Sequence, residues 1–224
     1  MTHKRSWKRY KLGYSISRMK LDDYLFQYQS LISGNVLDIG GTKNAKAGYF
    51  DIDRVSNKVS YLNIDPNTKP DYLCSAENIP IRENKFDTVI LCEVLEHLEN
   101  PVSAVHEAFR VLKPDGNIII TMPFLFKLHA EPNDYQRWTE YKLKKTLMEA
   151  GFSNIEIKRL GGFWSVLADL IKIKISAIKW RWLALFLGAL FVPMQYFFIE
   201  VLEKFLSSYH SKEWPLHYGL TAKK

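Results

Sequence analysis

A glycine pair and two acids in the first third of the chain have the residue types and spacing of a nucleoside site. Gly40 and Gly41 follow the short branched apolar run 36–39, at a position where a Cβ would block a tight turn or a ligand's approach. Asp65 ends a second predicted strand, 61–65. An acid at the carboxyl end of a strand beside a glycine turn can accept hydrogen bonds from both hydroxyls of a ribose. These residues therefore predict that the chain binds a nucleoside.

The glycine spacing disfavours a dinucleotide. A dinucleotide site needs G-x-G-x-x-G, so that the pyrophosphate sits on a helix N-terminus. The run from Gly40 to Ala45 does not supply it. A dehydrogenase is therefore not expected.

The segments that must position these residues alternate between strands and helices. Such alternation favours a parallel sheet with right-handed crossovers and ligands at the carboxyl ends of its strands. The pattern predicts an α/β fold, a mostly parallel sheet with helices on both faces. Strands are expected at 36–39, 61–65, 72–74, 86–92, 117–122, 154–160 and 214–223, and helices at 18–33, 93–98, 101–112 and 140–150.

Four stretches in order resemble successive motifs of the class I S-adenosylmethionine-dependent methyltransferases. They are 36–41, 75–80 (SAENIP), 86–98 (FDTVILCEVLEHL) and 110–116 (RVLKPDG). The resemblance covers roughly residues 30–160 and the last ten. It implies S-adenosylmethionine as cofactor and a Rossmann-like, seven-stranded sheet whose antiparallel final strand, 214–223, inserts between the fifth and sixth strands. No metal site is expected, because the six histidines show no ligand spacing with acids or cysteines.

The resemblance also assigns cofactor contacts one by one. Gly40, followed by Gly41, would approach the methionine portion of the cofactor, and Asp38 would anchor its ammonium through water. Glu93 would contact the methionine end. The ribose would be held by Asp65, and the adenine edge by Ala76 and Glu77. The motif departs from the family pattern at Thr42, which stands where the second glycine belongs, so a non-catalytic nucleoside-binding module is a rival interpretation.

The stretch 123–139 is too polar and too rich in proline for a core, and it is predicted to face the transferred methyl group. It is similar to the His-x-x-Pro-x-Asp-Tyr-x-Arg-x-Thr stretch of a methyltransferase subgroup associated with cell-envelope glycans and lipid-linked saccharides. We expect His129 or Asp134 to remove a proton from a hydroxyl acceptor, with Tyr135 and Arg137 holding an anionic or sugar group. The alternative is a structural role, in which Asp134 caps a turn and pairs with Arg137.

Charge and hydropathy divide the rest of the 224-residue chain. The net charge is +7, and seven basic residues precede the first acid, Asp22: Lys4, Arg5, Lys8, Arg9, Lys11, Arg18 and Lys20. A basic arm attracts phosphate, so an RNA methyltransferase is a second enzyme alternative, although no nucleic-acid module accompanies the arm. Two cysteines without ligand spacing fit a reducing cytoplasm, and no secretory signal is apparent.

Residues 182–199 contain no charged residue. Basic residues precede this run and Glu200 follows it, and the final strand after it must return to the sheet. A single membrane span is therefore not expected. Instead, we expect helices that lie in one leaflet of the membrane, and the alternative is an apolar cap or a dimer interface. Pro193 is expected to break or kink this segment. The predicted organisation is an arm and helix at 1–33, a core at 34–161, an apolar helical insertion at 162–212 and the final strand at 213–224. Peripheral association with the inner face of the cell membrane follows as an expectation.

Overall fold

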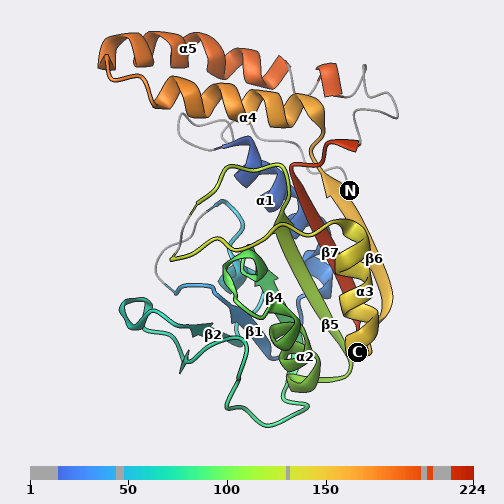
Figure 1. Ribbon diagram of the computed structural model, residues 1–224. Coiled ribbons are helices and arrows are strands. Elements are labelled where there is room, and N and C mark those ends of the chain that lie inside the picture. The colour runs from blue at the N-terminus through green and yellow to red at the C-terminus, as the bar shows by residue number, and fades with distance from the viewer. Residues whose placement is uncertain (1–14, 44–47, 130–131, 198–200, 204–212) are drawn as a thin grey trace.

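The computed structural model describes residues 15–43, 48–129, 132–197, 201–203 and 213–224. The basic arm before Ser15 lies outside these residues. A seven-stranded sheet with the order β3-β2-β1-β4-β5-β7-β6 forms the centre of the molecule (Figure 1). Its strands are β1 Val36–Ile39, β2 Val59–Asn63, β3 Tyr72–Leu73, β4 Phe86–Cys92, β5 Leu112–Pro123, β6 Ser153–Leu160 and β7 His217–Lys223.

The strand directions confirm the predicted fold class. β1 to β5 pair in parallel, and β7 lies antiparallel between β5 and β6, with Ile119 opposite Thr221 and Ile157 opposite Leu220. The carboxyl ends of β1 and β4 are adjacent, because Ile39 pairs with Leu91. The residues that follow these two strands are therefore brought together.

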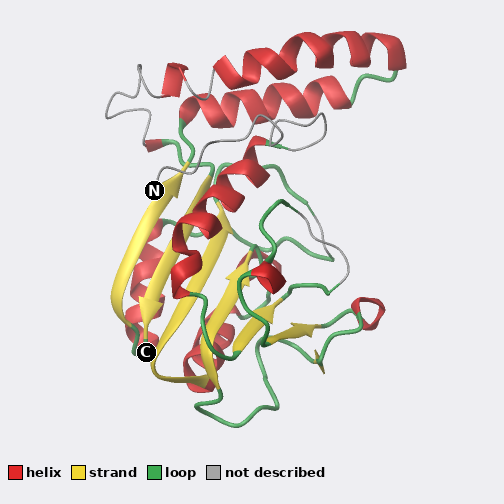
Figure 2. Ribbon diagram, turned by 180° about the vertical axis from the view of Figure 1, so that it is seen from behind, coloured by secondary structure: helices red, strands yellow, loops and turns green. Residues whose placement is uncertain are grey.

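Helices cover both faces of the sheet. α1 (Ile16–Tyr28) crosses one face, and α2 (Pro101–Val111) and α3 (Glu140–Ala150) cover the other (Figures 1 and 2). Leu21, Tyr24 and Leu25 of α1 pack on one core cluster, which includes Val36 and Ile119, while α2 and α3 contribute to a larger cluster on the opposite face. α1 thereby becomes the roof over the ends of β1 and β4.

Local sequence signals fix several boundaries. The Ser15 hydroxyl accepts the amide of Arg18 at 3.1 Å and starts α1. Thr139 caps α3 in the same way through Lys142, and Gly151, with φ of 102°, ends it as expected.

Several predicted boundaries differ from the structure. The helix expected at 18–33 is α1, which ends at Tyr28, and the final strand expected from residue 214 begins at His217. β2 ends at Asn63 rather than Asp65. The stretch 93–98 holds only a 3-10 turn, Leu95–His97, instead of a helix. The strand expected at 117–122 begins earlier, at Leu112, so that 113–116 falls inside β5, where the pairing with β4 jumps from Phe86–Leu112 to Thr88–Asn117. Asp115, with φ of 61°, lies in this bulge.

A helical hairpin projects beyond the carboxyl edge of the sheet (Figures 1 and 2). It consists of α4 (Phe163–Ser176) and α5 (Arg181–Phe197), and α5 continues through Pro193. Its base packs on Ile16 of α1 and on Leu216 before β7 through Ala168 and Phe191. Among the described residues no helix combines the length and the apolar character needed to cross a bilayer.

Candidate active site

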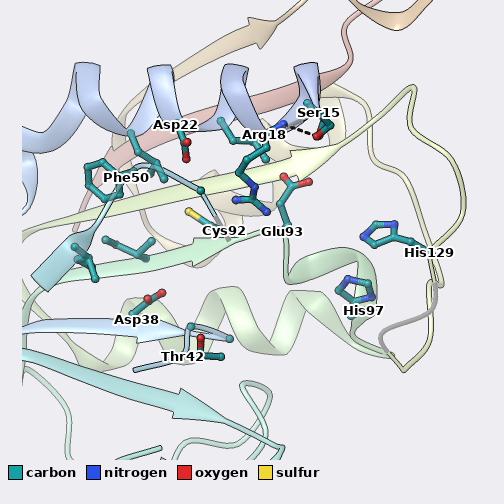
Figure 3. Close-up of a pocket in the computed structure, with 18 of the residues that line it drawn as sticks. Ser15, Arg18, Asp22, Asp38, Thr42, Phe50, Cys92, Glu93, His97 and His129 are labelled. Carbon is teal, nitrogen blue, oxygen red and sulfur yellow. Dashed lines mark hydrogen bonds between the residues drawn. The ribbon is translucent and has the colours of Figure 1, made fainter. Parts of the chain in front are cut away.

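A cavity of about 460 Å³ lies between α1 and the carboxyl ends of β1 and β4 (Figure 3). Of the predicted site residues, Asp38, Gly40, Gly41, Glu93 and His129 line it. Further lining residues come from the start of α1, from the segment 48–52, from β4 and the turn after it, and from the loop after β5. They include Ser15, Ser17, Arg18, Asp22, Gly48, Phe50, Cys92, His97 and Phe126. The cavity thus joins the glycine turn to the loop predicted to face the acceptor.

The Gly40–Gly41 turn has no room for side chains. Gly40 has φ of +81°, and a Cβ there would lie 2.5 Å from Cγ2 of Val94. A Cβ on Gly41 would lie 2.0 Å from Oδ2 of Asp38. The glycine pair therefore lets the Asp38 carboxylate fold across the turn at the edge of the cavity.

The other predicted cofactor residues lie outside the cavity lining. Oδ1 of Asp65 accepts the amide of Asn67 at 2.9 Å and caps a short 3-10 turn. Ala76 is buried in the larger core cluster, and Oε1 of Glu77 accepts the amide of Asn100 at the start of α2. The expected ribose and adenine contacts of these three residues stay predictions.

Glu93 links the tip of β4 to two other elements. Its φ of 55° is in the left-handed region, and Figure 3 shows its carboxylate pointing toward α1. Oε2 of Glu93 lies 3.0 Å from Nδ1 of the fully buried His217 on β7, and Nε2 of that ring lies 2.7 Å from Oγ of Ser17 on α1. Burial alone would raise the pKa of Glu93. The charge of His217 and the contact of its ring with the Glu93 carboxylate outweigh burial, so that the pKa of Glu93 is lowered.

Arg18 is a site residue that the sequence analysis assigned to the basic arm. Figure 3 shows its guanidinium pointing down from α1 into the cavity, toward the Glu93 carboxylate. The charge of Arg18 also helps to lower the pKa of Glu93. The sequence signal that could have revealed this role is the helical spacing that begins at Ile16, because it places Ser17 and Arg18 in the first turn of α1.

The loop after β5 contains a connected group of charges. Arg137 donates to both carboxylate oxygens of Asp134, and Oδ2 of Asp134 also accepts the backbone amide of His129 at 3.0 Å. The bonds from Arg137 overcome the effect of burial and lower the pKa of Asp134 to about 2. A carboxylate with this pKa is a weak base, so His129 is the better candidate to act on a hydroxyl.

Tyr135 does not line the cavity. Its hydroxyl donates to Oε1 of Glu99 at 3.0 Å and accepts from Nδ2 of Asn133, and almost half of the residue is exposed. The pairing of Asp134 with Arg137 matches the structural alternative considered for this loop. The acceptor contacts expected of Tyr135 and Arg137 stay predictions.

Comparison with known proteins agrees with the fold class and the domain expected from the motifs. Residues 37–120 match the family described as "Methyltransferase domain". A solved SAM dependent methyltransferase from Archaeoglobus fulgidus superposes with a TM-score of 0.58 at 15% identity, covering 92% of this chain and 94% of that one. The chain has the class I methyltransferase fold. The methyltransferase domain and its S-adenosylmethionine cofactor, both expected from the motifs, are supported by these matches.

Two curated relatives are similar to parts of this sequence. The Ubiquinone biosynthesis O-methyltransferase of Hydrogenovibrio crunogenus is 32% identical over 107 residues, which are 42% of this chain and 44% of the relative. The Demethylmenaquinone methyltransferase of Staphylococcus saprophyticus is 26% identical over 117 residues, 39% of this chain and 50% of the relative. The chain thus spans about half the length of the curated relatives it matches.

Replacing Gly41 with Ala is expected to weaken S-adenosylmethionine binding by about 10- to 100-fold. The new Cβ must displace the Asp38 carboxylate, and a hydrogen bond to a charged group contributes about 1.5–3 kcal/mol. Isothermal titration would measure the change. Gly188→Ala is the matched control, because a Cβ at Gly188 meets no atom within 4 Å. Equal affinity of the Gly41 variant and the control would contradict the assignment of this turn.

Proposed function

We propose that this chain is a methyltransferase that transfers the methyl group of S-adenosylmethionine to a hydroxyl oxygen of a lipid-linked acceptor. The observation that carries the proposal is the cavity itself, which places the Gly40–Gly41 turn and His129 on one continuous space. Methyl transfer is a direct displacement, so donor and acceptor must be aligned within one such space. We assign the donor to the end at Asp38 and the acceptor hydroxyl to the end at His129.

The position of the helical hairpin supports an acceptor with a lipid tail. Phe126 lines the cavity and also packs against the cluster at the base of the hairpin. Along α5, apolar side chains at a spacing of four residues are exposed: Trp182, Phe186, Leu190 and Met194. Lys174 and Lys179 lie exposed near the end of α4 and the turn. An apolar stripe beside basic residues suits the surface of an anionic bilayer, and we place the chain at the cytoplasmic face of the cell membrane.

Two acceptor classes fit this arrangement. The resemblance of the loop 129–139 to enzymes of cell-envelope glycans supports a lipid-linked saccharide. The names of the two relatives support a quinone precursor as the second candidate. Both classes combine a hydroxyl-bearing head with a long apolar tail.

Transfer of labelled methyl groups tests the proposal. The purified chain is incubated with methyl-tritiated S-adenosylmethionine and a detergent extract of bacterial membranes, and the organic phase is analysed by mass spectrometry for products that have gained one methyl group. Labelled saccharide lipids support the first acceptor class and labelled quinones the second. Label in added RNA would instead favour an RNA methyltransferase, and failure to bind S-adenosylmethionine at millimolar concentration would favour a non-catalytic module.

The double variant Trp182→Ser/Phe186→Ser is expected to bind anionic vesicles at least about tenfold more weakly. Trp182 is 85% exposed and Phe186 61%, and burying one large apolar side chain contributes about 1.5–3 kcal/mol. Co-sedimentation with vesicles containing phosphatidylglycerol measures the partition. Tyr141→Ser on α3 is the control, since Tyr141 is 78% exposed on a helix away from the hairpin. Equal binding of both variants would remove the α5 stripe as the membrane contact.

A further inference from the structure

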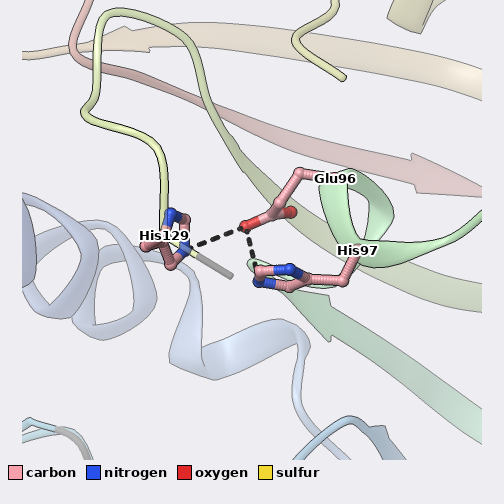
Figure 4. A group of neighbouring side chains, drawn as sticks. All are labelled: Glu96, His97 and His129. Atoms are coloured by element: carbon pink, nitrogen blue, oxygen red, sulfur yellow. Dashed lines mark ion pairs between the residues drawn. The ribbon is translucent and has the colours of Figure 1, made fainter. Parts of the chain in front are cut away.

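A buried carboxylate lies between two imidazole rings at the acceptor end of the cavity. Oε1 of Glu96 is 3.6 Å from Nε2 of His97 and 3.9 Å from Nε2 of His129 (Figure 4). Both distances are too long for hydrogen bonds. Glu96 is fully buried, and neither of its carboxylate oxygens has a hydrogen-bond partner among the described residues. Such a group costs free energy unless a positive charge or a donor meets it.

The two imidazole rings are oriented so that their Nε2 atoms face this carboxylate. Nδ1 of His97 lies 2.5 Å from the carbonyl oxygen of Asn133, and since a carbonyl only accepts, this nitrogen carries the hydrogen. The lone pair of the neutral ring is then on Nε2. Nδ1 of His129 lies 3.4 Å from Oδ2 of Asp134, which Arg137 holds in place. A carbonyl or carboxylate behind the far ring nitrogen is the usual support of a metal-binding histidine.

The spacing of the three side chains suits one ion. Ligands about 2.1 Å from a metal are separated by about 3.0 Å in octahedral and about 3.4 Å in tetrahedral geometry. The ligand atoms of Glu96, His97 and His129 lie within 4.8 Å of one another. Side-chain movements of well under 1 Å would therefore bring all three onto a common centre.

We propose that Glu96, His97 and His129 bind a divalent cation of the first transition series, between manganese and zinc. Two imidazole nitrogens and one carboxylate oxygen are a donor set that such ions prefer, and three protein ligands leave coordination positions open. The sequence analysis expected no metal, because the histidines show no ligand spacing with acids or cysteines, and only two of these three ligands are neighbours in the chain. The loop after β5 brings the third to them.

The catalytic consequence rests on the proposed function, whereas ion binding itself does not. The acceptor hydroxyl would occupy an open position, where the cation makes it more acidic and its proton leaves to solvent. The oxygen then attacks the methyl carbon, the carbon–sulfur bond breaks, and its electron pair stays on sulfur. His129 then serves as a ligand of the ion instead of taking the proton itself.

Metal binding to the untagged full-length chain tests this inference without acceptor or S-adenosylmethionine. The chain is stripped with chelator, and binding of Mn²⁺ is followed by electron paramagnetic resonance and of Co²⁺ by its visible absorption. We expect one ion per chain, and a loss of affinity of at least about tenfold in Glu96→Gln and in His97→Gln. His106→Gln, an exposed histidine on α2, is the matched control and should bind like the natural chain.

A further variant separates metal binding from folding, and the comparison with methyl transfer separates metal binding from catalysis. If Glu96→Gln does not fold, His129→Gln, which changes a partly exposed side chain, provides the second ligand variant. The inference is overturned if Mn²⁺, Co²⁺ and Zn²⁺ all bind at less than a fifth of an ion per chain at about 100 μM, or if the ligand variants bind as tightly as His106→Gln. A chain that binds one ion through these residues but methylates no lipid would overturn only the proposed function.

Discussion

Replacing His129 with Gln is expected to lower kcat for methyl transfer by about 10²- to 10⁴-fold and to leave the affinity for S-adenosylmethionine unchanged. Activation of an acceptor hydroxyl contributes this much whether the imidazole takes the proton or holds an ion beside it. His129 lines the cavity at the end opposite Asp38, so its loss should not disturb the donor. Single-turnover rates with saturating donor measure the effect.

The control for this prediction is again His106→Gln, which changes the same residue type on the exposed side of α2. An undiminished single-turnover rate in the His129 variant would remove His129 from the reaction. Addition of Mn²⁺ or Co²⁺ then separates the two roles of the ring. If His129 is a metal ligand, the transfer rate of the natural chain depends on the ion. If His129 is a simple base, the rate does not depend on the ion.

Local signals in the sequence predicted the scaffold of the site well. The branched run 36–39 followed by Gly40, and the Thr139 and Gly151 boundaries of α3, depend on contacts within a few residues. The insertion of β7 between β5 and β6 is a long-range feature, and it was predicted only because the last strand resembled the family's final strand. Sequence patterns therefore located the Gly40–Gly41 turn at the end of β1 before any coordinates.

The composition of the acceptor end could not be predicted, because it depends on which side chains meet across the cavity. Glu96 and His97 sit in a 3-10 turn rather than on a helix, so their directions did not follow from helical spacing. His129 reaches them only through the path of the loop after β5. Asp65, in contrast, was predicted to belong to the site but does not line the cavity. The reason is that β2 ends two residues earlier than expected and the Asp65 carboxylate caps the turn that follows.

Replacing His217 with Leu is expected to lower the free energy of unfolding at pH 7 by about 3 kcal/mol. Removing the partner of a buried carboxylate costs about 3–5 kcal/mol because its charge stays buried. Glu93 would lose the contact at 3.0 Å, and Ser17 would lose its partner at 2.7 Å. The guanidinium of Arg18 remains near Glu93, which places the expected loss at the lower end of the range (Figure 3). Urea unfolding followed by circular dichroism measures the difference.

The pH dependence of this loss follows from Glu93. In the natural chain its pKa is lowered, so the stabilisation is present above the unfolded value of about 4.3 and disappears as the pH falls through the lower folded value. In the variant, burial without His217 should raise the pKa of Glu93 above 4.3. The carboxyl then takes up a proton on mild acidification, and the difference between the two proteins should shrink as the pH falls from 7 toward 5.

A second substitution identifies the buried charge as the cause. Glu93→Gln in the His217→Leu background removes the carboxylate that the first change leaves unpaired, so the double variant should recover most of the lost stability at pH 7. A double variant as unstable as His217→Leu alone, or a loss independent of pH, would show that His217 acts through packing. In that case the link from β7 through Glu93 to α1 would not be what holds the roof of the cavity in place.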